Sequence, residues 1–253
     1  MVMQKNKKYD IVGIGNAIVD LIAEVDDSYL EKNSINKGSM SLVDYDVANR
    51  IGNEVDIVKT ISGGSVANSI VCIAQQNLKT VFIGKVNQDE LGEKFAKGLA
   101  EENVEFKITK SLANKHTARC IILVSPDAER TMNTYLGVSQ ELTEEDVDLN
   151  IIEESSILYL EGYLWDLDNA KKAIKKSIST AINSETKIAF SISDAFCVDR
   201  FREEFIDLVN NSADIIFANE SEIKSLFETN ELNDAIKKCQ DTKKIFALTL
   251  GDK

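Results

Sequence analysis

Histidine, cysteine and proline are scarce in this sequence of 253 residues, and each scarcity narrows what the chain can be. With one histidine, His116, and no CxxC pair among four scattered cysteines, a Cys/His zinc site is nearly excluded. Nothing around His116 resembles a nucleophile elbow, which argues against a Ser-His-Asp triad. Scattered cysteines in a reducing compartment are typical of small core residues. The single proline, Pro126, predicts a turn between two strands.

Long apolar runs and an excess of basic residues are also absent. No stretch approaches the roughly 20 apolar residues of a membrane span, and the first ten residues lack the apolar segment of an export signal. Acidic residues outnumber basic ones by 42 to 29, so the net charge of −13 disfavours binding to nucleic acid or to an anionic membrane. The composition, 43% hydrophobic and 28% charged, is that of a globular protein, and we expect a cytoplasmic one.

Short β-branched runs alternate with helical patterns along most of the chain. This alternation predicts an α/β fold with a largely parallel central sheet that is covered by helices on both faces. The predicted strands cover residues 10–14, 56–61, 80–84, 156–160, 187–191, 214–218 and 244–250. The predicted helices cover residues 65–76, 89–102, 167–182, 200–210, 220–227 and 232–239.

One stretch breaks the alternation, because residues 118–125 and 130–136 have the pattern of a β-hairpin with no helix between its arms. Residues 18–25 and 39–43 are further short strand-like segments. Together these segments predict a small antiparallel sheet beside the main one, in the position of a lid.

The first glycine motif lies in residues 9–20, where a buried strand ends at Gly15 and Asn16. Gly13 and Gly15 suggest a dinucleotide fingerprint, but Ile18 takes the place of its third glycine and a strand follows instead of a helix. Asp20 lies just past a strand end, where open α/β sheets bind ligands. It is either a carboxylate that accepts hydrogen bonds from vicinal sugar hydroxyls or a solvated acid in a turn.

A second glycine motif, SGGSVANS at residues 62–69, joins a predicted strand to a predicted helix. Gly63 and Gly64 let the backbone approach a ligand closely, and the helix that follows exposes unpaired N–H groups. Asn68, one turn into this helix, points back toward the same space. A simple glycine turn with Ser65 as the N-cap explains the glycines but not the position of Asn68.

Two further strand ends carry polar residues, and each allows two interpretations. Asn219 and Glu222 have the spacing of a capping box, and they are also oxygen ligands suited to a water-rich magnesium shell. Thr249 and Gly251 end a buried strand, either as a turn that contacts a nucleotide or as an ordinary strand exit.

Taken together and in order, these segments resemble the PfkB, or ribokinase-like, family of carbohydrate and nucleoside kinases. The matching segments are GNAIVD at 15–20, SGGSVANS at 62–69, IGKVNQDELG at 83–92, RTMNTYLG at 130–137, YLEGYLWD at 159–166, ANESE at 218–222 and TLGDK at 249–253. Those at 130–137 and 159–166 are most similar to the adenosine-kinase-like branch. The resemblance implies one three-layer α/β/α domain over residues 1–253, with a β lid formed by parts of 16–43 and 104–136.

The activity that this resemblance implies is ATP-dependent, Mg²⁺-dependent phosphorylation of a hydroxymethyl group on a sugar or nucleoside such as ribose, fructose or adenosine. Phosphoryl transfer of this kind needs mainly positioning, charge neutralisation and exclusion of water. Nucleotide binding is implied for Asn219, Thr249 and Gly251, and metal binding for Glu222. The residues implied to bind the acceptor are Asn16, Asp20, Gly63, Gly64, Asn68 and Glu161.

The sequence departs from the family at one point, because it stops at Lys253 and no GAGD-type segment occurs in it. That segment supplies the family's anion hole and its catalytic base, so no catalytic residue is assigned and the base is expected beyond Lys253. We therefore expect this polypeptide alone, whether a fragment or a natural truncation, to have little or no kinase activity. We also expect an open sheet edge at residues 244–250 that favours association.

Two other functions stay open at this point. A noncatalytic sugar-binding or nucleoside-binding remnant would keep the acceptor residues without turnover, whereas a dinucleotide-dependent oxidoreductase is disfavoured by the failed fingerprint. Some aromatic residues could stack on a base, although such residues more often pack in the core or the lid. They are Tyr135, Tyr163, Trp165 and Phe196. The identity of the sugar or nucleoside is not readable, and an apolar lid face could pair with a second copy as a homodimer.

Overall fold

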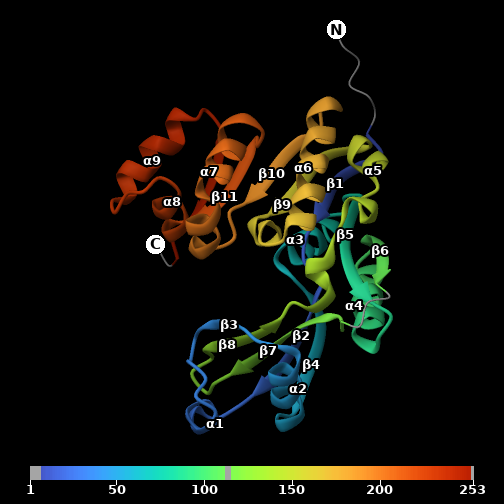
Figure 1. The fold of residues 1–253 in the computed structure, drawn as a ribbon, viewed down its shortest axis with the longest axis vertical. Helices are drawn as coiled ribbons and strands as arrows, with labels where there is room; N and C mark the ends of the chain where they lie inside the picture. Colours follow the sequence, from blue (N-terminus) through green and yellow to red (C-terminus); the bar gives the residue numbers. More distant parts are fainter. Residues whose placement is uncertain (1–6, 112–114, 252–253) are drawn as a thin grey trace.

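A parallel sheet of seven strands forms the centre of the larger part of the molecule (Figure 1). The computed structural model describes residues 7–111 and 115–251. The strand order is β12-β11-β10-β9-β1-β5-β6, and each pair of neighbours runs parallel. The strands are β1 (Tyr9–Ile14), β5 (Thr80–Asn87), β6 (Glu105–Ser111), β9 (Ser155–Glu161), β10 (Lys187–Ser191), β11 (Ile215–Asn219) and β12 (Ile245–Thr249).

Helices cover both faces of this sheet, and each face has its own apolar core. On one face α3 (Ser65–Ala74) and α4 (Glu90–Glu101) pack Ile70 and Phe95 against Phe82. On the other face the helices are α5 (Leu149–Glu153), α6 (Asp168–Asn183), α7 (Ala195–Asn211), α8 (Glu220–Leu226) and α9 (Leu232–Asp241). The three-layer α/β/α prediction is therefore confirmed. No helix in the described part of the chain is long and apolar enough to cross a bilayer.

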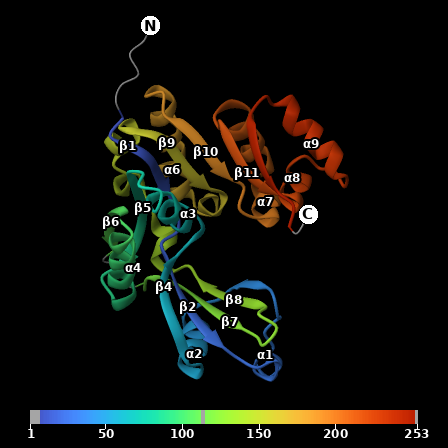
Figure 2. The same cartoon turned by 180° about the vertical axis from the view of Figure 1, so that it is seen from behind.

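A second sheet of five strands lies beside the first, as Figures 1 and 2 show from opposite sides. Its order is β3-β8-β7-β2-β4. The strands are β2 (Ile18–Glu24), β3 (Met40–Leu42), β4 (Ile57–Gly63), β7 (Ala118–Val124) and β8 (Arg130–Tyr135). Two helices that the sequence did not predict, α1 (Asp27–Lys32) and α2 (Tyr45–Glu54), cover one face of this lid sheet.

The lid differs from the prediction in three ways. It is mixed and not antiparallel, because β2 pairs in parallel with β7, and β3 with β8. The strand predicted at 56–61 belongs to the lid, as β4 antiparallel to β2, and its largely exposed pattern is that of an edge strand. Conversely, the strand formed by residues 105–111, within the 104–136 range expected to supply the lid, is β6 at the edge of the main sheet.

Helix α7 begins five residues before the predicted start at residue 200. Its first turn is separated from the remainder by Phe201, whose φ of −127° and ψ of 24° are not helical. Ser193, just before the helix, has a φ of +77°, in the left-handed region that costs most side chains energy. These two backbone breaks define a short separate turn at the carboxyl end of β10.

A buried ion pair fixes the segment that returns from the lid to the main sheet. Lys85 Nζ on β5 lies 2.8 Å from Asp146 Oδ2 and donates to the carbonyl of Glu141 at 2.9 Å. The same Asp146 oxygen accepts from the backbone N and Oγ1 of Thr143 at 2.7 and 2.9 Å. Burial alone would raise the pKa of Asp146, but the Lys85 and Thr143 contacts hold this pKa below its ordinary value.

We predict that Asp146→Ala lowers the free energy of unfolding by about 3 kcal/mol at pH 7, because it leaves the Lys85 charge buried without its partner. The exposed pair of Lys237 and Asp234 provides the control, and Asp234→Ala should cost about 0.5 kcal/mol or less. Urea denaturation measures both changes. Since the folded-state pKa of Asp146 is depressed, the difference between wild type and Asp146→Ala should be full at pH 7 and shrink below about pH 4. A loss under about 1 kcal/mol at pH 7 would contradict this role of the pair.

Candidate functional site

A cleft of about 440 Å³ lies between the carboxyl ends of the main-sheet strands and the uncovered face of the lid. Five of the six predicted acceptor residues line it, and the sixth, Gly63, lies directly beside Asp20. Apolar side chains of the lid form its opposite wall. The five residues are Asn16, Asp20, Gly64, Asn68 and Glu161, and the lid wall includes Met40, Leu42, Ile122 and Met132.

Asp20 projects its carboxylate into the cleft from the lid sheet. It lies on β2, with Ile61 of β4 on one side and Cys120 of β7 on the other. Its pKa is raised to about 6, because burial disfavours the charged form and only the charge of Arg130 opposes this. A Cβ atom at Gly63 would collide with the Asp20 carboxylate, so glycine is needed there. A partly buried carboxylate that accepts no hydrogen bond from the described residues is suited to a ligand.

Gly64 brings the start of α3 against the turn that follows β1. Its φ of +100° is in the left-handed region, and a Cβ there would collide with the carbonyl oxygen of Asn16. The helix begins at Ser65, and Asn68, whose backbone N donates to the Gly64 carbonyl at 2.9 Å, is exposed on the cleft side. Both glycines of the SGGS motif are therefore required by close approach to Asp20 and to the Asn16 carbonyl, whereas the sequence predicted close approach to a ligand.

Glu161, the last residue of β9, is buried and uses its carboxylate within the protein. Oε1 accepts hydrogen bonds from the backbone N and from Nδ2 of Asn16, each at 2.8 Å. Oε2 accepts from the Ser65 hydroxyl and, at 3.4 Å, from the backbone N of Val66. Burial raises the pKa of Glu161, and these four donors oppose the rise. The side chain thus lines the cleft, but its oxygens contact the turn after β1 and the start of α3.

The first turn of α7 forms a wall of the cleft, although core or lid packing was the commoner interpretation for its Phe196 in the sequence. Phe196 is 73% exposed although it is aromatic, and it lines the cleft with Tyr163. Arg200 donates to both carboxylate oxygens of Asp166, at 3.0 and 3.1 Å, and so ties α7 to the segment after β9. The sequence signal for an earlier start of α7 was Asp194, an aspartate that follows a buried strand. Asp194 accepts from the backbone N of Phe196 at 2.7 Å and caps the helix.

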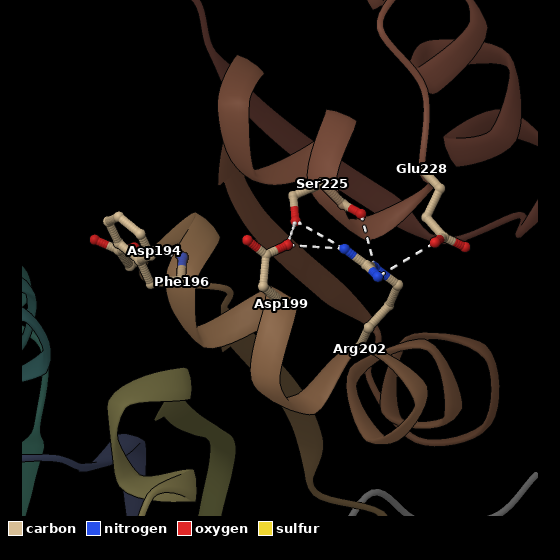
Figure 3. Close-up of polar contacts among 6 residues, drawn as sticks. All are labelled: Asp194, Phe196, Asp199, Arg202, Ser225 and Glu228. Atoms are coloured by element: carbon tan, nitrogen blue, oxygen red, sulfur yellow. Dashed lines mark hydrogen bonds and ion pairs between the residues drawn. The ribbon is translucent and has the colours of Figure 1, made fainter.

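The opposite side of this turn is attached to α8, as Figure 3 shows. Asp199 Oδ1 accepts from the Ser225 hydroxyl at 2.7 Å and from Arg202 Nη2 at 2.8 Å. Arg202 also donates from Nε to the Ser225 carbonyl at 3.0 Å and contacts Glu228 Oε1 at 3.3 Å. These contacts fix the wall that carries Phe196 relative to the helix that follows β11.

The predicted nucleotide and metal residues lie at the ends of β11 and β12, outside the lining of the acceptor cleft. Asn219 and Glu222 form a capping box: Asn219 Oδ1 accepts from the Glu222 backbone N, and Glu222 Oε2 from the Asn219 backbone N, both at 2.9 Å. Thr249 is the register partner of Asn219 on the neighbouring strand, and Gly251 follows in a turn with a φ of +69°.

Burial and the charge of Asp194 raise the pKa of Glu222, so the two carboxylates are close enough to interact. The hydrogen bonds between Asn219 and Glu222 show the capping role that their spacing allows. No group of three or more His, Cys, Asp or Glu side chains within residues 7–111 and 115–251 has the arrangement of a protein-only metal site.

The catalytic base expected beyond Lys253 stays a prediction. Lys253 itself lies outside the described residues, together with Asp252 of the same TLGDK segment. The described part of that segment ends at Gly251, just after β12. No residue of the described part is assigned to proton transfer.

Comparison with known proteins relates this geometry to one family. The model of the pfkB family carbohydrate kinases matches residues 9–253. Among solved structures, a probable sugar kinase from Rhizobium etli is 36% identical, with a TM-score of 0.89, over 96% of this chain and 74% of that one. The adenosine kinase from Sinorhizobium meliloti is 40% identical, with a TM-score of 0.87, over 97% of this chain and 75% of that one.

A curated relative, 5-dehydro-2-deoxygluconokinase from Listeria monocytogenes serovar 1/2a, is 26% identical over 85% of this chain. The aligned region spans 62% of that relative's length. The family match over nearly the whole sequence, the shared fold and the order of the strand-end motifs agree with one another. This chain belongs to the pfkB family of carbohydrate kinases.

Proposed function

We propose that this chain supplies the acceptor site of a kinase that transfers the γ-phosphoryl group of ATP to the hydroxymethyl group of a nucleoside or sugar. The observation that carries the proposal is the carboxylate of Asp20, which is partly buried in the cleft without a hydrogen bond from the described residues. The amides of Asn68 and Asn16 line the same cleft. Together they offer the acceptors and donors that a set of ribose-like hydroxyls requires.

Each part of the cleft has a separate task in this proposal. The ionised Asp20 carboxylate accepts hydrogen bonds from vicinal hydroxyls, and Asn68 orients them from the start of α3. The apolar lid wall, which includes Leu42 and Met132, excludes water that would otherwise compete as the phosphoryl acceptor. Acceptor binding and orientation are thus the steps that the described residues support.

The nucleotide is proposed to lie at the ends of β11 and β12, near Asn219, Thr249 and Gly251. Each carboxylate oxygen of Glu222 accepts one hydrogen bond from Asn219 and can still accept from water, so Glu222 would hold a magnesium ion through the ion's water shell. When bound, magnesium would neutralise the charge of the phosphate groups during transfer. Asp194 lies near both the acceptor cleft and the proposed nucleotide site. It caps α7, whose first turn lines the cleft, and its charge acts on Glu222.

Phe196 favours a nucleoside over a free sugar. An aromatic ring that is 73% exposed at a cleft loses apolar burial, unless a flat ligand such as a purine base covers it. The Sinorhizobium meliloti neighbour at 40% identity is an adenosine kinase, which supports the same acceptor class here.

Calorimetric titration of the purified chain with adenosine, ribose and fructose tests this proposal. We expect adenosine to bind, and we expect Phe196→Ala to weaken its affinity about tenfold, the typical value of a lost base–aromatic stack, without changing the affinity for ribose. Ile182→Ala, a truncation of an exposed side chain on α6, should change neither affinity. If the wild-type chain binds none of the three compounds, the proposal is wrong.

Assay of ADP formation with ATP and magnesium tests separately the expectation that this polypeptide alone turns over little.

We predict that Asp20→Asn stabilises the protein at pH 7.5 while it weakens adenosine binding about 100-fold, the scale of two lost charge-assisted hydrogen bonds. Burial of the charged form raises the pKa of Asp20 from 3.8 to about 6, so the wild type loses about 3 kcal/mol of stability as the pH rises between these values. The asparagine variant lacks this titration. Urea unfolding at pH 4 and pH 7.5 should therefore show a stability difference that appears only at the higher pH, and equal curves at both pH values would contradict the shift.

A further inference from the structure

The buried carboxylate of Glu161 is surrounded by donors alone. Only 1% of the residue is exposed, and the groups within hydrogen-bond distance are two N–H donors of Asn16, the Ser65 hydroxyl and the Val66 backbone N–H. The family resemblance implies that Glu161 binds the acceptor. The contacts give it a different task, because both oxygens are directed at the protein.

These contacts settle the orientation of the Asn16 side chain. An amide can normally be turned by 180°, which exchanges its oxygen and its nitrogen. Here Oε1 of Glu161 accepts both from the backbone N and from Nδ2 of Asn16, each at 2.8 Å, so this oxygen acts as an acceptor. The turned amide would place its oxygen against this carboxylate oxygen, so Nδ2 is held toward Glu161 and Oδ1 is held away from it.

The oxygen of Asn16 is left without a partner among the described residues. Asn16 is only 4% exposed and lines the cleft, and within the described residues Oδ1 is buried and has no hydrogen bond. Buried polar atoms of native proteins nearly always have partners, and an unpartnered one in a ligand cleft points to the ligand. The missing partner of Oδ1 must be a donor, such as a hydroxyl group.

We propose that Glu161 is a positioning residue that determines specificity: it fixes Asn16 with Oδ1 toward the acceptor, so the site selects a compound that donates a hydroxyl hydrogen there. This inference rests on the proposed function, because the acceptor is the nucleoside or sugar proposed above. Glu161 itself does not contact the acceptor. Its second oxygen holds Ser65 and Val66, so the same side chain also sets the position of α3, which carries Asn68.

Two substitutions of Glu161 separate this role from a merely structural one. Glu161→Gln keeps an oxygen for Asn16, and its new NH₂ group can donate to the Ser65 hydroxyl, which can also accept, so only the long bond from the Val66 backbone N is lost. Glu161→Leu has a similar size but offers no acceptor, so the Asn16 amide becomes free to turn. The glutamine variant should therefore retain the selectivity of the site, and the leucine variant should lose it.

The experiment compares adenosine with its 2′-, 3′- and 5′-deoxyfluoro analogues by calorimetry, because fluorine in place of a hydroxyl cannot donate. In wild type, we expect at least one analogue to bind tenfold or more weakly than adenosine. We call each such loss of affinity, relative to adenosine, a penalty. Asn16→Ala identifies which of these penalties depends on Asn16. That penalty should persist in Glu161→Gln and fall below threefold in Glu161→Leu, while penalties at hydroxyls bound by Asp20 remain.

The outcomes distinguish this inference from the proposed function. If wild type binds no adenosine, the proposed function is wrong. If adenosine binds but the Asn16 penalty is the same in Glu161→Leu as in wild type, or all penalties fall equally, the role of Glu161 is overturned.

A measurement on the unliganded wild type covers the case in which Glu161→Leu does not fold. Side-chain amide hydrogens of Asn16 should exchange with solvent at least tenfold more slowly by NMR than those of Asn53, which is exposed on α2. Equal exchange rates would show that Glu161 does not hold the amide, and would also overturn the proposal.

Discussion

The carboxylate of Glu161 is the interaction on which the cleft depends, because it joins three segments that are remote in sequence. Asn16 and Ser65 precede it by 145 and 96 residues, yet both donate to it at the end of β9. The two adjacent lid strands adjoin these contacts: β2 begins after Asn16, and β4 ends before Ser65. The starts of both connections to the lid are therefore tied to the main sheet at a buried carboxyl group, where loss of any donor would be costly.

The polar groups of the cleft are arranged at the expense of stability. Gly63 and Gly64 carry no side chain, so that Asp20 and the carbonyl of Asn16 can lie against the start of α3. A chain selected for stability alone would not keep a partly buried carboxylate without a partner at Asp20 or an exposed ring at Phe196. Both features lie at one cleft, which is typical of a site that a ligand completes.

The sequence predicted the strand ends well, because glycines and polar residues after buried runs mark them directly. Asp20, Gly64 and Asn68 line one cleft, but Asp20 lies within β2 of the lid and not past a strand end as its position in the sequence suggested. It could not place β4, since an edge strand of the lid has the same β-branched pattern as a strand of the main sheet. Strand β6 was missed because its charged residues, such as Glu105 and Lys107, interrupt the apolar pattern.

The partners of Glu161 were beyond prediction for a different reason. Its hydrogen bonds depend on how β9 lies against the turn after β1, and no local pattern near residue 161 encodes a contact with residues 16 and 65. The wall around Phe196 was not assigned to the site because an aromatic residue is most often core or lid packing, whereas Phe196 is 73% exposed at the cleft.

The central place of β1 bears on how this chain folds during synthesis. Strand β1 is the first strand of the described residues, yet it pairs with β5 on one side and with β9 on the other. The ribosome must therefore release residues up to 161 before this strand has both neighbours, and β2 waits in the same way for β7. Until then the apolar strands β1 and β2 have incomplete pairing, which favours aggregation of nascent chains of this topology while they emerge.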